Sequence, residues 1–170
     1  MEVGVKIAFV GDVVGKPGRL AVRSLLPKLI TDSSEFDAII INGENSSGFR
    51  GITHRIFKEL IRAGATVVTT GTHVWAQQDV FNFIYDEPRI VRPANYPAGV
   101  PGRGSTVVTL NDGRKLGVIN LAGQHFMPSF DNPFRALDRI LPQVVSEADS
   151  IIVDFHAEAT SEKIAMGWYA

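Results

Sequence analysis

Short apolar runs rich in valine and isoleucine alternate along this chain with longer segments whose apolar residues recur at helical spacing. The short runs predict strands at residues 6–10, 38–41, 66–69, 116–120 and 151–155. The longer segments predict helices at residues 20–30, 53–63, 77–84 and 133–145. This alternation is typical of right-handed βαβ units, so we expect an α/β fold with a mostly parallel sheet that is covered on both faces.

Local signals mark several boundaries of these elements. Thr53 is expected to cap the second helix and Gly64 to end it, whereas Pro27 should kink or shorten the first helix. The turn signal Asn111-Asp112-Gly113 predicts an inserted hairpin between residues 106–110 and 115–120. Residues 160–163 look like a capped helix start, and the apolar pattern that follows is still running at the last residue. We therefore expect a fold that is truncated at its C-terminal end and that leaves an apolar face exposed.

Composition narrows the class of protein. At 170 residues and 45% hydrophobic content, we expect one domain over residues 1–170, with Trp75 and Trp168 in its core. Seventeen basic and eighteen acidic residues give a net charge of −1, which argues against binding to duplex nucleic acid or an anionic membrane. There is no cysteine, and no apolar run approaches the ~18 residues of a membrane span, so we expect a cytoplasmic protein. A homo-oligomer is also compatible with this composition.

Polar side chains follow several of the predicted strands at the point where each strand ends. Ligands of open α/β sheets bind beyond the carboxyl ends of the strands, so these side chains are the candidate site. Carboxylates, imidazoles and amides together suit Mn, Fe or Zn. Singly, each residue also has an ordinary structural interpretation as a turn, cap or core residue. The candidates are Asp12, Glu44, Asn45, His73, Asn120 and His156.

Three other features are weaker candidates. The segment from Gly11 to Pro17 is not a Walker A loop, because three residues separate its glycines and Pro17 stands where Ser or Thr would hold Mg²⁺. His54 is expected on the surface of a helix. His125 follows a strand closely enough to border the site.

Five segments together resemble a known family. They are residues 9–19 (FVGDVVGKPGR), 42–45 (NGEN), 91–97 (VRPANYP), 131–134 (DNPF) and 154–163 (DFHAEATSEK). Over the whole chain they resemble the YmdB-like branch of the calcineurin-like metallophosphoesterases. The resemblance implies a four-layer α/β/β/α sandwich with two divalent metal ions, which hydrolyses phosphodiesters such as 2′,3′-cyclic nucleotides through a metal-bound water.

The resemblance also implies a role for each matched residue. Asp12 and Asn45 correspond to ligands of the first metal, Glu44 to the bridge between the metals, and His156 to a ligand of the second. His73 corresponds to the general acid, which would protonate the leaving oxygen. Such a pair of cations acidifies a water and neutralises charge on the phosphoryl group.

Three departures from the family pattern change this expectation. Thr72 stands where the family carries an Asn ligand, which should weaken the second metal site. The family's Gly-Thr-His-Thr-His segment, which supplies two more histidines, lies beyond Ala170, so this chain resembles the N-terminal two-thirds and is expected to hold one metal or none. Gln124 stands where members often carry Arg, which puts a phosphate contact there in doubt.

Three functions follow from these patterns. The first is a metal-dependent phosphodiesterase with a small phosphodiester substrate. The second is a degenerate, non-catalytic module that binds a nucleotide or a protein partner through the same sheet edge. The third is a nucleotide-binding domain that uses helix N-termini, and the carboxylates of Asp12 and Glu44 argue against it because they repel phosphate.

Overall fold

The computed structural model describes residues 4–33 and 36–170, in which strands and helices alternate over most of the chain. The strands are β1 (Ile7–Val10), β2 (Ala38–Asn42), β3 (Val67–Thr69), β4 (Ile90–Val91), β5 (Ser105–Thr109), β6 (Lys115–Ala122) and β7 (Ser150–His156). The helices are α1 (Gly15–Ser33), α2 (His54–Ala63), α3 (Pro133–Glu147) and α4 (Thr160–Tyr169), with short 3-10 helices η1 (Val74–Ala76) and η2 (Gln78–Asn82).

The described strands form two sheets, whereas the sequence pattern predicts one mostly parallel sheet. The first sheet is parallel throughout, in the order β1-β2-β3-β4. The second has the order β5-β6-β7, with β5 antiparallel and β7 parallel to β6. The predicted hairpin is therefore confirmed, but it begins a new sheet. Strand β6 can be central to that sheet because nearly all of its residues are buried, on both faces.

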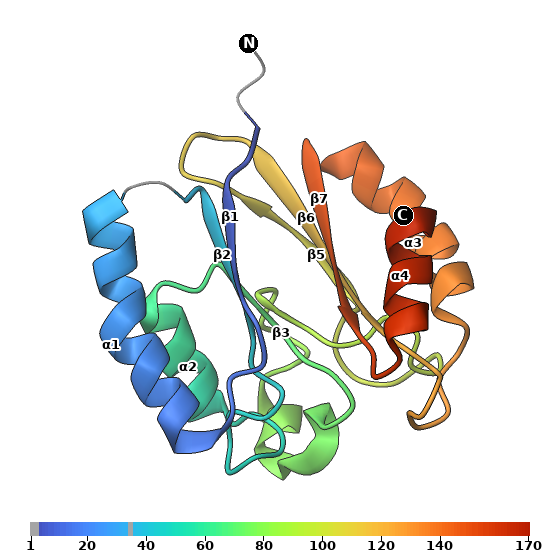
Figure 1. Ribbon diagram of the computed structural model, residues 1–170, viewed down its shortest axis with the longest axis horizontal. Coiled ribbons are helices and arrows are strands. Elements are labelled where there is room, and N and C mark those ends of the chain that lie inside the picture. Colours follow the sequence, from blue (N-terminus) through green and yellow to red (C-terminus); the bar gives the residue numbers. More distant parts are fainter. Residues whose placement is uncertain (1–3, 34–35) are drawn as a thin grey trace.

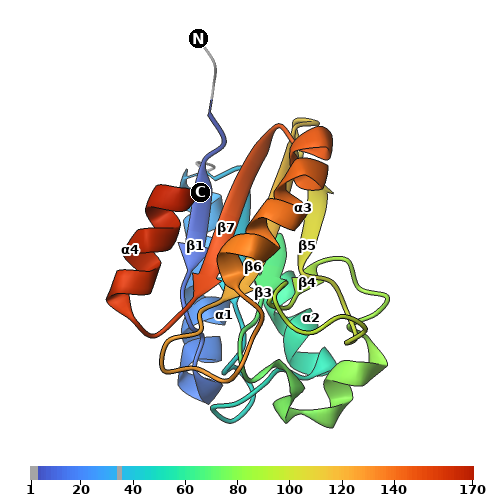
Figure 2. The same ribbon diagram turned by 90° about the vertical axis from the view of Figure 1, so that its right-hand side faces the viewer.

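The two sheets lie face to face, with helices outside each of them, so that α1 and α2 lie on one side of the molecule and α3 and α4 on the other (Figures 1 and 2). Three buried apolar clusters fill the spaces between these layers. One joins α1 and α2 to the first sheet, and one joins the outer face of the second sheet to α3 and α4. The third lies between the sheets and contains Ala38, Ile40, Val67, Val91, Leu110, Leu116 and Val118.

Helix α2 shows why local sequence fixes its boundaries. Thr53 accepts a hydrogen bond from the backbone N–H of Ile56 at 3.3 Å, which satisfies one of the unpaired donors of the first turn. Gly64 ends the helix in the left-handed conformation, at φ 119°, and its N–H bonds to the carbonyl of Ile61. Both predicted signals are confirmed.

Other local predictions are wrong. Residues 77–84 do not form an α-helix but belong mainly to η2, which follows η1. Pro27 is expected to kink or shorten α1; the helix is not shortened, because it continues through Pro27 to Ser33, and the kink stays a prediction. Helix α4 begins after Ala159 without a side-chain cap. Trp75 packs against the first apolar cluster as expected, but Trp168 is 88% exposed.

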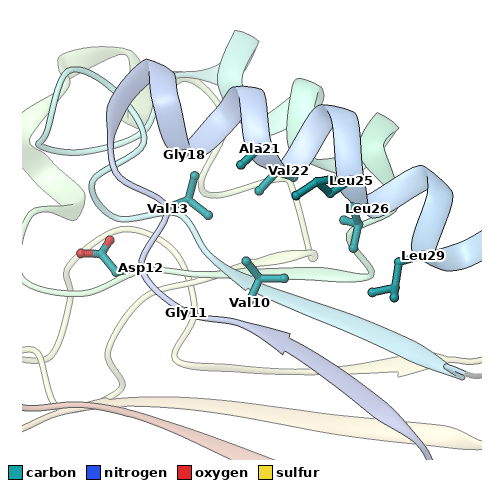
Figure 3. Close-up of a pocket in the computed structure, with 10 residues that line it drawn as sticks. All are labelled: Val10, Gly11, Asp12, Val13, Gly18, Ala21, Val22, Leu25, Leu26 and Leu29. Atoms are coloured by element: carbon teal, nitrogen blue, oxygen red, sulfur yellow. The ribbon is translucent and has the colours of Figure 1, made fainter.

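The structure leaves an apolar groove beside β1, the outer strand of its sheet. The groove has a volume of about 600 Å³, and the leucines of α1 that line it point toward the strand, with Asp12 near one end (Figure 3). Leu25 is 62% exposed in this region, whereas the expected apolar face left by truncation of the fold stays a prediction. Among residues 4–33 and 36–170, no helix has both the length and the apolar character needed to cross a membrane.

The C-terminal cap of α2 gives a stability prediction. A Cβ on Gly64 would overlap the Cδ1 atom of Ile30, and the left-handed conformation disfavours any L side chain. Gly64→Ala should therefore lower the free energy of unfolding by about 1–2 kcal/mol. Urea denaturation measures this change. The matched control is Gly167→Ala, at a helical position with no atom within 4 Å, which should leave the stability unchanged or raise it; equal losses in both variants would contradict the cap argument.

Candidate metal centre

Four loops at the carboxyl ends of the strands bring the candidate side chains together. The first sheet supplies Asp12 after β1, Glu44 and Asn45 after β2, and His73 after β3. The second sheet supplies His156, the last residue of β7. Contacts between side chains of these loops show that the cluster predicted from the sequence does assemble, and that it draws on both sheets.

Glu44 is the centre of this cluster. The residue is 1% exposed, and its Oε1 lies 3.2 Å from Nε2 of His156 and 3.5 Å from Nδ1 of His73. Its Oε2 is buried with no hydrogen-bond partner among the described residues. A buried carboxylate oxygen without a partner is costly, and a cation is the ligand that would satisfy it.

Gly71 makes room for this carboxylate. A Cβ at Gly71 would overlap Oε2 of Glu44 and would lie 2.7 Å from Cδ2 of His156. Any other residue at position 71 would therefore displace the two side chains that meet there. The glycine that follows β3 is required by close approach at the centre of the cluster.

Asn45 links the remaining members. Its Nδ2 donates to Oδ2 of Asp12 at 2.8 Å and makes a longer contact of 3.4 Å with Oε1 of Glu44. Its Oδ1 lies 2.7 Å from Nδ1 of His73, and since an amide oxygen only accepts, Nδ1 carries the proton. This hydrogen bond orients the His73 ring and leaves its Nε2 as the nitrogen that can exchange a proton with a ligand.

The surroundings shift two titrating groups of the cluster. Burial by itself disfavours the charged form of His156, but the hydrogen bond and charge of Glu44 outweigh it and raise the pKa of His156 above its ordinary value. Burial also raises the pKa of Tyr96 to about 12, so its hydroxyl stays protonated. That hydroxyl lies 3.3 Å from the Thr72 carbonyl oxygen, to which it donates, and so holds the loop that precedes His73.

Other predicted residues lie outside the cluster. Thr72 contributes its backbone carbonyl to the contact with Tyr96. Asn120 is fully buried, and its Nδ2 donates to the carbonyl oxygens of Thr70 and Val91 rather than to the clustered side chains. His54 is half-buried and stacks on Phe83, rather than lying free on the surface. His125 is exposed and its backbone N–H donates to Glu162 at 3.3 Å, so its place at the border of the site stays a prediction.

Sequence reasoning missed two polar residues beneath the cluster. Asn42 is buried at the end of β2, and its Nδ2 donates to Oδ2 of Asp154 in β7 at 3.2 Å. Burial raises the pKa of the Asp154 carboxyl. A signal was present, because an acidic residue inside an apolar strand run is rarely buried without a partner. The sequence did not say which partner it has.

The donor set fits a divalent cation in its chemistry. Two carboxylates, two imidazoles and an amide oxygen are the mixture that Mn, Fe and Zn accept, and Glu44 offers an unpartnered oxygen at the centre. Across residues 4–33 and 36–170, however, no group of three or more His, Asp and Glu side chains is arranged to hold a metal ion by itself.

Fold and cluster together define a class, that of α/β proteins with a metal-type donor cluster at the carboxyl ends of parallel strands. The comparisons with known proteins make this specific. The model of the family described as YmdB-like protein matches residues 8–170, and the chain belongs to this family.

Three relatives show how far the likeness extends. The 2′,3′-cyclic-nucleotide 2′-phosphodiesterase of Bacillus subtilis (strain 168) is 48% identical over 164 residues, which is 96% of this chain and 61% of that protein. The crystal structure of a hypothetical protein from Thermus thermophilus has a TM-score of 0.88 at 40% identity, over 96% of this chain and 62% of that one. A novel phosphatase from Mycoplasma pneumoniae has a TM-score of 0.87 at 32% identity, and the match covers 99% of this chain and 61% of that one. The chain thus spans about three fifths of the length of these relatives.

The Glu44–His156 pair predicts a pH effect. A raised pKa means that the folded state binds the proton of His156 more tightly than the unfolded chain does. The contribution of the pair to stability is therefore complete below the ordinary histidine pKa, and it is lost as the pH rises through the raised value. Glu44→Gln removes the charge and keeps the burial, so the pKa of His156 should fall, as measured by NMR titration of its ring protons.

Asp12→Asn is the matched control for this titration. The Asp12 carboxylate acts on His156 through its charge alone, so its removal should lower the pKa of His156 by less than Glu44→Gln does. An equal or larger fall in Asp12→Asn would contradict the central place of Glu44.

Proposed function

We propose that this protein is a metal-dependent phosphodiesterase that hydrolyses small phosphodiesters such as 2′,3′-cyclic nucleotides. The observation that carries the proposal is the buried Glu44 carboxylate, with one oxygen facing two imidazoles and the other left without a hydrogen-bond partner in the described structure. Membership of the family implies the use of divalent metal, and the name of the Bacillus subtilis relative supports the substrate class.

The proposed cofactor is a pair of divalent ions, Mn, Fe or Zn. Asp12 and Asn45 would hold the first ion, His156 the second, and Glu44 both. Thr72, a hydroxyl in place of an amide, should hold the second ion weakly, so that this chain binds one ion more tightly than the other. When bound, such ions lower the pKa of a water and neutralise charge on the phosphoryl group.

His73 is the proposed general acid. Its Nδ1 donates to Asn45, which fixes the ring and keeps Nε2 available. Protonated at Nε2, the ring can deliver a proton to the oxygen that leaves phosphorus, and this help matters most when that oxygen belongs to a poor leaving group.

The proposed fold follows the same assignment. Helices outside each of two facing sheets support a four-layer α/β/β/α sandwich of the calcineurin-like metallophosphoesterase type, with residues 1–170 as a single domain. The mixed α/β architecture itself is shared with the solved phosphatase from Mycoplasma pneumoniae.

A second candidate is a non-catalytic module that binds a nucleotide through the same cluster. One observation favours it, namely the hydroxyl of Thr72 at a position where the family carries an amide ligand. The phosphodiesterase would hydrolyse its substrate, whereas the module would only bind a nucleotide. Binding of a nucleoside monophosphate without hydrolysis of any phosphodiester, at saturating Mn²⁺, would select the module.

Mn²⁺ should support hydrolysis of 2′,3′-cyclic AMP by the chain, and Glu44→Gln should reduce the turnover by about 100-fold or more, because it removes the shared carboxylate ligand. Product formation followed by chromatography measures this. Glu147→Gln, an exposed glutamate at the end of α3, is the matched control and should keep wild-type turnover. Unchanged activity in Glu44→Gln would disprove the role of Glu44.

The general-acid role predicts a dependence on the leaving group. His73→Gln should lower turnover of 2′,3′-cyclic AMP, whose leaving oxygen is an alkoxide, by about 100-fold or more. Turnover of bis(4-nitrophenyl) phosphate should fall much less, because nitrophenolate leaves without protonation. The ratio of the two rates is the measurement, and equal losses on both substrates would assign His73 to binding instead.

A further inference from the structure

The two halves of the proposed site come from different sheets, so the site depends on how the sheets are placed against each other. Glu44 follows a strand of the first sheet and His156 ends a strand of the second, yet their side chains meet at 3.2 Å. An apolar cluster between the sheets holds them together by hydrophobic burial, which has no directional preference. Ile40, Val67 and Val118 belong to this cluster. Such contacts set the separation of the sheets, and hydrogen bonds across the same space add the directional constraint that burial lacks.

Directional contacts occur at the carboxyl ends of the strands, just below the site. Asn42 donates to Oδ2 of Asp154 at 3.2 Å and to the carbonyl oxygen of Thr70 at 3.3 Å. Asn120, whose register partner in β7 is Asp154, donates to the same Thr70 carbonyl oxygen at 2.8 Å. Each of these amides therefore bonds across the space between the sheets, and we call Asn42, Asn120 and Asp154 the inter-sheet polar layer.

This layer connects directly to both halves of the site. The Oδ1 of Asn42 accepts the backbone N–H of Glu44 at 3.2 Å, so the amide that bonds to Asp154 also holds the main chain of Glu44. On the other sheet, Asp154 and His156 lie two residues apart in β7 and therefore on the same face of the strand. The Asp154 carboxylate is thus linked to the backbone of Glu44 through the side chain of Asn42. It also lies two residues before His156, on the same face of β7.

We propose that Asp154 is a positioning residue for the Glu44–His156 pair. Its hydrogen bond to Asn42 fixes the two sheets against sliding at the level of the site, so that both ligands face the same point. The structural part of this proposal stands on the hydrogen bonds themselves, and its effect on metal binding rests on the proposed function.

A role in positioning can be separated from a role in stability. In Asp154→Leu the Asn42 amide loses one of its two hydrogen bonds and keeps the one to Thr70, so the loss of stability should be small. Asp154→Asn keeps an acceptor oxygen for Asn42. The two variants therefore differ in the hydrogen bond while both can fold.

The experiment compares these variants in three measurements: urea unfolding, hydrogen exchange at the backbone amide of Glu44, and Mn²⁺ affinity by calorimetry. Asp154→Leu should unfold near the wild-type midpoint but bind Mn²⁺ about 10-fold more weakly, the effect expected for loss of an outer-shell partner. Its Glu44 amide should exchange about 10-fold faster, because the Asn42 side chain that accepts this N–H is then held by the Thr70 carbonyl alone. Asp154→Asn should restore both values most of the way.

The control is Asp149→Leu, which removes a carboxylate that accepts the Lys115 N–H beside the opposite end of β7 and should leave Glu44 exchange and Mn²⁺ affinity unchanged. Wild-type values of both in Asp154→Leu would overturn the proposal, as would losses that simply follow the unfolding midpoint or that Asp154→Asn does not reverse. If the wild-type chain bound no Mn²⁺, the proposed function would fail, and Glu44 exchange alone would then decide the positioning role.

Discussion

The packing of one β-sheet against another is the interaction on which the rest of this structure depends. Ile40 and Val67 of the first sheet and Val118 of the second are fully buried in the cluster between them. Because each sheet also carries helices on its outer face, most residues of β2, β3 and β6 are buried, and most of these are apolar. The candidate site exists only because this packing brings the ends of β2 and β7 together, since neither sheet alone supplies both Glu44 and His156.

The buried carboxylate of Glu44 costs free energy of folding, and a region with only a structural role would not retain such a group. Glu44 is almost completely buried, yet one of its oxygens has no hydrogen-bond partner in the described structure, and Gly71 leaves just enough room for the carboxylate. Stable cores avoid such groups, whereas functional sites retain them. The pKa of His156 is raised although burial disfavours its charged form, because the buried Glu44 carboxylate beside the ring favours that form.

The metal-type donor cluster and the family membership are independent observations. The donor set is explained by strand ends and hydrogen bonds, without reference to any relative, while the family model matches nearly the whole chain. The solved relatives share the fold at TM-scores of 0.87 and 0.88, with identities of 32% and 40%. What the local chemistry adds is an order of importance, in which Glu44 is central, Asn45 joins Asp12 to His73, and the inter-sheet polar layer lies beneath them.

The sequence by itself determined the elements whose signals are local. The caps at Thr53 and Gly64, the hairpin turn and five strand positions depend on neighbouring residues, and the strand ends were enough to select the members of the cluster. Tertiary structure decided the rest. The division into two sheets, the partner of Asp154 and the exposure of Trp168 depend on contacts between residues far apart in the chain. Periodicity shows that a residue faces a core, but it does not show which element lies on the other side of that core.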